Sequence, residues 1–196
     1  CLDWICGITN TSITDTFTNV EKYFNDPSLV SNSSFFLPYL SGERTPHNDP
    51  HIRGSFHAMK TTTDATNMQY AVIEGVSFGI LDGFNSILKV NDNFEKIFMV
   101  GGGSRSSFWI ELLASLLKRN LSVCDQSEYG AALGVARLAM LSDTNIHSKN
   151  DIIKEIKISK DYKPKSKSTD LLMKRYEIWR DLYSSNKRIA ANLLQL

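Results

Sequence analysis

Cysteine, net charge and long apolar runs are all scarce in this chain of 196 residues. Its three cysteines, Cys1, Cys6 and Cys124, are odd in number and lack paired spacing, so we expect reduced thiols of a cytoplasmic protein instead of a disulfide framework. A formal net charge of +1 provides no field that would attract nucleic acid. No apolar run approaches the length of a bilayer span. We therefore expect neither nucleic acid nor a membrane as a partner.

The chain does contain enough apolar sequence for a core. With 42% hydrophobic residues, its length suits one domain with an appended tail. We place the domain at residues 1–145 and the tail at residues 146–196. In the tail, a basic loop is expected over residues 157–167 and a long amphipathic helix over residues 170–194.

Periodicity predicts the other elements. We expect helices over residues 2–8, 20–24, 64–88, 106–118 and 129–141, and strands over residues 35–39, 55–59, 94–100 and 121–124. The last two strands alternate with helices, which favours parallel pairing in an α/β domain. In the helix over residues 64–88, small residues recur every four positions, at Ala71, Gly75, Gly79 and Gly83. Each interior glycine costs about 1 kcal/mol relative to alanine, so we expect another backbone to pack closely on this face.

Three glycines, Gly101, Gly102 and Gly103, stand between an expected strand and an expected helix. Glycine lets a backbone turn sharply and approach a ligand closely, and a helix start offers unpaired N–H groups. This pattern indicates a nucleotide site, although tight packing of strand and helix would select the same residues. A dinucleotide site is a minor alternative. Asp125 follows the next strand as a ribose-binding acid would, but Ser106 stands where that fingerprint has its third glycine.

A second motif lies upstream of the glycines. It runs Leu40-Ser41-Gly42-Glu43-Arg44-Thr45-Pro46-His47 and is closed by Arg53-Gly54-Ser55-Phe56. This segment resembles the sugar kinases of the FGGY family, and most closely their xylulokinase branch. Three further blocks follow in the order of that family: a long helix around residues 74–83, an adenosine motif at residues 101–109 and a small-residue helix at residues 130–139. The resemblance covers residues 1–141 and, more loosely, the tail.

The resemblance implies an α/β fold of the ribonuclease H-like, actin-like ATPase type and a kinase that phosphorylates a sugar, D-xylulose in the most similar branch, with MgATP. Complete FGGY kinases have two such domains, and the first carries the catalytic Asp and most sugar contacts. The first residues, from Cys1 to Trp4, resemble the helix after the phosphate loop. We therefore expect a fragment that begins inside the second domain, lacks its first strands and is inactive alone. A kinase for gluconate or ribulose and a non-catalytic actin-like domain remain alternatives.

The resemblance further implies which residues contact ATP. Gly101, Gly102 and Gly103 would hold the adenosine, with Ser104 beside them. Ser107 matches a position that is a nucleotide-contacting Asn in some FGGY kinases, although a serine here could merely serve the helix start. No catalytic residue is expected in this chain, because the family base lies in the first domain.

Three more residues match family positions near the nucleotide. Gly130 and Ala131 would line the adenine pocket, although plain helix packing would also explain them. Asp3 lies on the helix that follows the phosphate loop, where an exposed carboxylate is the alternative. Mg²⁺ and the sugar would be held mainly by parts outside this chain, and a homodimer is a further expectation.

Four residues of types that bind metals lie close together in the sequence: His47, Asp49, His51 and His57. His47 and His51 would share a face only in a helix. The flanking prolines make a regular helix improbable there, so we expect no metal ligand. Glu43 and Arg44 are expected to pair and so anchor this loop.

Overall fold

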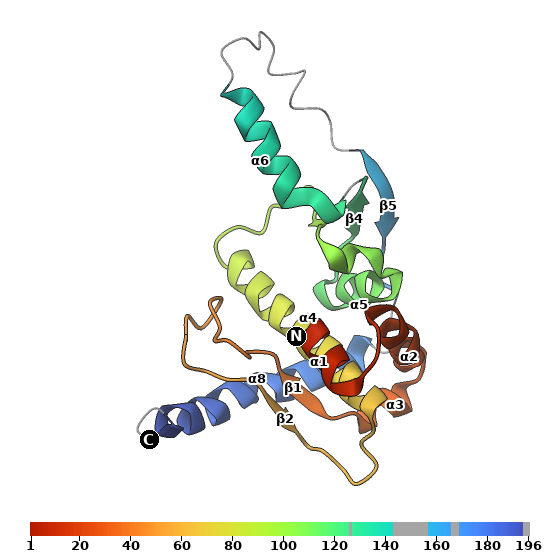
Figure 1. The fold of residues 1–196 in the computed structure, drawn as a ribbon, viewed down its shortest axis with the longest axis vertical. Helices are drawn as coiled ribbons and strands as arrows, with labels where there is room; N and C mark the ends of the chain where they lie inside the picture. Colours follow the sequence, from red (N-terminus) through yellow and green to blue (C-terminus); the bar gives the residue numbers. More distant parts are fainter. Residues whose placement is uncertain (126, 143–156, 166–168, 194–196) are drawn as a thin grey trace.

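The computed structural model describes residues 1–125, 127–142, 157–165 and 169–193 (Figure 1). Its helices are α1 (Leu2–Thr9), α2 (Ile13–Asn25), α3 (Pro27–Asn32), α4 (Ala65–Leu88), α5 (Ser107–Leu117), α6 (Gly130–Leu141) and α8 (Thr169–Leu193), with short 3-10 helices η1 (Gly102–Arg105) and η2 (Ser127–Tyr129). Its strands are β1 (Phe35–Leu37), β2 (Ser55–His57), β3 (Phe98–Met99), β4 (Leu121–Cys124) and β5 (Ile158–Tyr162).

The strands form two small sheets. β1 and β2 pair antiparallel. β3 and β4 pair in parallel, and β5 joins the free side of β4 antiparallel. The predicted parallel pairing of the two strands around the glycine turn is therefore confirmed, although β3 is much shorter than the strand predicted over residues 94–100.

Helix starts follow side-chain caps that the sequence contains. Asp64 caps α4, since its carboxylate accepts the Asn67 N–H at 2.7 Å. Ser12 caps α2 by accepting the Asp15 N–H at 3.0 Å. This cap starts α2 at Ile13, well before the helix predicted over residues 20–24.

α4 is the central helix and packs against β1, α1, α2 and α5. The backbone of β1 comes closest at Gly75, where a β-carbon would overlap the Phe36 carbonyl oxygen. At Gly79 a β-carbon would lie 3.6 Å from Pro38 Cγ, which is ordinary contact. The predicted close packing of the small-residue face is confirmed, and it is concentrated at Gly75.

By length and composition, α4 is the one helix in the described part of the chain that could cross a bilayer. This corrects the expectation that no run approaches that length. The helix nevertheless buries Gln69, Glu74 and Asp82 among neighbouring elements, as a core helix of a globular domain does.

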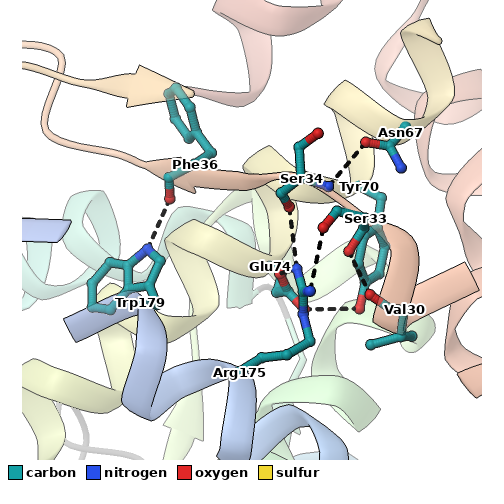
Figure 2. A network of polar contacts seen from close by, with 9 residues as sticks. All are labelled: Val30, Ser33, Ser34, Phe36, Asn67, Tyr70, Glu74, Arg175 and Trp179. Atoms are coloured by element: carbon teal, nitrogen blue, oxygen red, sulfur yellow. Dashed lines mark hydrogen bonds and ion pairs between the residues drawn. The ribbon is translucent and has the colours of Figure 1, made fainter. Parts of the chain in front are cut away.

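α8 packs along β1 and also against α3, α4 and α5 (Figure 1). Leu172, Tyr176 and Trp179 are buried, and Trp179 Nε1 donates to the Phe36 carbonyl at 2.8 Å. Figure 2 shows this bond beside the contacts of Arg175 with Glu74 and with the carbonyls of the segment before β1. The C-terminal helix therefore completes the core around β1. The predicted domain boundary at residue 145 lies outside the described residues.

The basic loop predicted over residues 157–167 is wrong in part, because residues 158–162 form β5. Tyr162 is buried against α5, which gives the strand an inner face, and Lys160 stays exposed. Lysines are common on edge strands because they oppose further pairing, so the basic composition is compatible with a strand in this position.

Candidate functional site

The glycine turn joins β3 to α5. Gly101 has φ 87°, a conformation that side-chain-bearing residues rarely adopt. η1 follows, and Ser106 then caps α5 by accepting the Trp109 N–H at 3.2 Å. The strand, glycine turn and helix thus occur in the predicted order, and Ser106 is the cap of α5.

The next two glycines have different surroundings. Gly103 packs against α5, because a β-carbon there would lie 2.7 Å from the Trp109 ring. The same ring donates from Nε1 to Ser77 Oγ on α4 at 2.8 Å, so Gly103 lies on a fixed aromatic support. Gly102 is exposed, has no left-handed φ, and has nothing within 4 Å of a β-carbon position. The fold requires glycine at Gly101 and Gly103, but no described neighbour requires it at Gly102.

The turn contacts the start of α6 through η2. The Gly101 N–H donates to the Ser127 carbonyl at 2.9 Å, and the Ser104 and Ser127 hydroxyls lie 2.7 Å apart. Gly130 lies close to the residue before the turn, since its β-carbon position is 3.3 Å from Val100 Cβ. The structure therefore brings together the glycine turn, Ser104 and Gly130.

The remaining predicted site residues are exposed and lie on three different helices. Ala131 is exposed on α6, a helix with no buried residue, so close packing in the described chain does not explain its small size. Ser107 is exposed, and its Oγ lies 2.9 Å from the Tyr162 hydroxyl on β5. Asp3 lies exposed in the first turn of α1, and no polar contact recorded among the described residues joins it to the glycine turn.

The loop that contains His47, Asp49 and His51 contacts α8 and α4 through His47. The His47 ring stacks on Tyr183 of α8 with centroids 3.6 Å apart, and its Nε2 lies 3.5 Å from Asp82 Oδ2. Glu43 accepts the His47 N–H at 2.8 Å, whereas the expected Glu43–Arg44 pair is not among the ion pairs of the described chain. Within those residues no three His, Cys, Asp or Glu side chains are placed to hold a metal. That no metal binds here remains a prediction.

Sequence reasoning missed two residues that shape the turn. Ser127 comes from a segment before α6 that has no strong periodicity, and only its place before Gly130 could have drawn attention to it. Trp109 lies within the helix predicted over residues 106–118, but no periodicity shows that its ring supports Gly103. Such contacts depend on how segments meet in space.

Comparisons with known proteins identify the family and the fold. Residues 3–142 match the FGGY family of carbohydrate kinases, C-terminal domain. The chain belongs to this family. Its fold is the ribonuclease H-like, actin-like type of these kinases, as predicted.

Individual relatives are similar over nearly the whole chain. The xylulose kinase of Escherichia coli strain K12 is 30% identical over 186 residues, which are 93% of this chain and 37% of that enzyme. The crystal structure of a xyloylose kinase from Brucella ovis has a TM-score of 0.76 at 29% identity, over 96% of this chain and 38% of that one. The gluconokinase of Bacillus subtilis is 29% identical over 119 residues, 60% of this chain and 23% of that enzyme. The chain thus spans well under half the length of these relatives.

Proposed function

We propose that this chain is the ATP-binding domain of a carbohydrate kinase and that the glycine turn receives the adenosine part of ATP. One observation carries the proposal: in the turn between β3 and α5, Gly102 is exposed and nothing in the described fold requires a glycine there. A glycine costs backbone entropy, so its presence is explained if a ligand must approach the main chain closely. ATP is the ligand that membership of a carbohydrate kinase family favours.

The surroundings of Gly102 support this assignment. Gly101 and Ser104 fix the turn on one side, and Gly130 and Ala131 begin α6 next to it. The first N–H groups of a helical turn have no partner inside the turn, so η1 presents donors to a bound group. The small residues at the start of α6 leave space for a flat purine. Asp3 and Ser107 are retained as candidate contacts, but the Tyr162 hydroxyl already bonds Ser107.

We further propose that the complete kinase transfers the γ-phosphoryl group of ATP to the 5-hydroxyl of D-xylulose. Similarity to xylulose kinases over 93% of the chain supports this substrate. Gluconate is a second candidate, because a gluconokinase is also similar. In phosphoryl transfer the protein positions the reactants and stabilises charge while a carboxylate accepts the hydroxyl proton. We place that carboxylate, and the groups that hold Mg²⁺ and sugar, outside this chain. A cytoplasmic location and a homodimer remain predictions.

A chimeric enzyme tests the proposal. This chain would replace the segment that it matches in the Escherichia coli xylulose kinase, and ADP release would be followed with D-xylulose. We expect an active chimera in which Gly102→Val raises KM for ATP more than KM for xylulose. The chain alone should release no xylulose-dependent ADP. Equal effects on both KM values, or turnover by the chain alone, would contradict the proposal.

A further inference from the structure

We infer that Ser127 is a positioning residue for the nucleotide site, because it holds the glycine turn against the start of α6. This inference rests on the proposed function, since it concerns the same site. Ser127 bonds the turn in two places: its carbonyl accepts the Gly101 N–H at 2.9 Å, and its hydroxyl lies 2.7 Å from Ser104 Oγ.

The direction of the hydroxyl bond follows from counting hydrogens. Ser104 Oγ donates its single hydrogen to the Gly101 carbonyl at 2.7 Å, because a carbonyl can only accept. Ser104 Oγ must then accept from Ser127, whose hydroxyl is the donor. The Gly101 carbonyl also accepts the Ser104 N–H at 3.0 Å. Both polar groups of Gly101 are thus fixed, one directly by Ser127 and the other through Ser104.

The hydrogen bond between the Ser127 and Ser104 hydroxyls is shielded from water on the Ser104 side. Ser104 is only 8% exposed, so water does not readily replace the Ser127 hydroxyl as its donor. Gly101 has the positive φ that directs the chain toward Gly102, and Gly130 follows Ser127 at the start of α6. One serine therefore sets the relative position of the two segments between which we propose that adenosine binds. Without its hydroxyl, the turn would keep the backbone bond from Gly101 to Ser127 but lose the second bond that fixes it against the start of α6.

Three variants of the full chain test the role of the hydroxyl. Ser127→Ala removes it, Ser127→Thr retains it, and Ser122→Ala is the matched control. Ser122 is buried and, like Ser127, donates its hydroxyl to another side chain, Asp161 at 2.6 Å, but it lies on β4 and no hydrogen bond among the described residues joins it to the turn. Two properties are measured: amide hydrogen exchange of Gly101 and Ser104 without ligand, and the Kd for ATP.

We expect Ser127→Ala to speed exchange at Gly101 and Ser104 and to raise the Kd for ATP, each about three- to tenfold, as loss of one buried hydrogen bond does. Ser127→Thr should stay within about twofold of wild type in both, and Ser122→Ala should leave both unchanged even where it lowers Tm. A Ser104→Ala, Ser127→Ala double variant should lose little more than Ser104→Ala alone, because Ser104→Ala already removes the bond that the two hydroxyls share.

The possible outcomes distinguish the positioning role of Ser127 from the proposed function. If Ser127→Ala binds ATP as tightly as wild type, the inference is overturned and the proposed function stands. An equal loss of affinity in Ser122→Ala would also overturn it, since the effect would then be general destabilisation. If the wild-type chain binds no ATP, the nucleotide role of the turn fails, and the positioning role of Ser127 fails with it.

Discussion

Arg175 on α8 and Glu74 on α4 form a buried ion pair with two bonds: Nε donates to Oε1 and Nη2 donates to Oε2, both at 2.7 Å (Figure 2). Nη2 also donates to the Ser34 carbonyl at 3.1 Å, just before β1. Burial raises the pKa of the Glu74 carboxyl, and the Arg175 charge opposes that shift. The pair therefore joins the C-terminal helix, the central helix and the entry to β1.

Breaking this pair should be costly. Arg175→Met leaves Glu74 buried without its cation, and we expect a loss of about 3–5 kcal/mol in the free energy of unfolding. Glu177→Gln, which breaks the exposed Arg180–Glu177 pair on the same helix, should cost less than about 1 kcal/mol. Urea denaturation of both variants checks this. Similar small losses would mean that α8 is not held by the buried pair.

Two glycines on one face of α4 should respond oppositely to alanine. Gly75→Ala places a methyl group on the Phe36 carbonyl and should destabilise by about 1–3 kcal/mol, because the backbone of β1 must move. Gly79→Ala meets only Pro38 at an ordinary distance and should stabilise by up to about 1 kcal/mol through helix propensity. Thermal unfolding distinguishes the two, and a raised Tm for Gly75→Ala would refute the close contact.

Replacement of Ala58 by glycine should stabilise the fold. It follows β2 with φ 56°, in the left-handed region that costs a residue with a β-carbon about 1–2 kcal/mol. Ala58→Gly removes that strain at a smaller entropic cost, so we expect a gain of up to about 1 kcal/mol. The matched change Ala65→Gly, at the start of α4, should destabilise. A lower Tm for Ala58→Gly would contradict the strain.

His57 should make stability depend on pH. Burial lowers the pKa of its imidazole, and a side-chain hydrogen bond with Asn186 partly opposes this shift. The unfolded chain therefore binds this proton more readily than the folded chain. The stability that depends on neutral His57 is present above its ordinary pKa of about 6.5 and is lost as the pH falls below it. Urea unfolding between about pH 5 and 8 should show a shallower acid loss in His57→Gln. An unchanged slope would count against a role for this histidine.

The sequence predicted the elements around the glycine turn because each has a local signal. The apolar strand, the three glycines and the apolar periodicity of α5 lie within one short segment, and a parallel partner follows directly. It also predicted the small-residue packing of α4, since repeated glycines need a close neighbour. Family membership was predictable from the segment over residues 40–56, and the match over residues 3–142 confirms it.

Other features could not be predicted, because their partners are distant in the chain. β5 pairs with β4 although it lies in a basic and polar stretch of the sequence, and pairing at a sheet edge depends on the neighbour rather than on apolar alternation. The Arg175–Glu74 pair joins residues that are 101 positions apart in the chain. Ser127 acts on the turn through a single hydroxyl, which no periodicity reveals.

Titration of ATP into the chain, compared between wild type, Gly102→Val and Gly7→Val, tests the central claim most directly. Both glycines are exposed with nothing within 4 Å of a β-carbon position, but no hydrogen bond among the described residues joins Gly7 to the turn. The account predicts that Gly102→Val leaves Tm unchanged or higher and weakens ATP binding at least about tenfold, or about 1.4 kcal/mol. Gly7→Val should bind as wild type does. Equal affinity of Gly102→Val and wild type would contradict the nucleotide site.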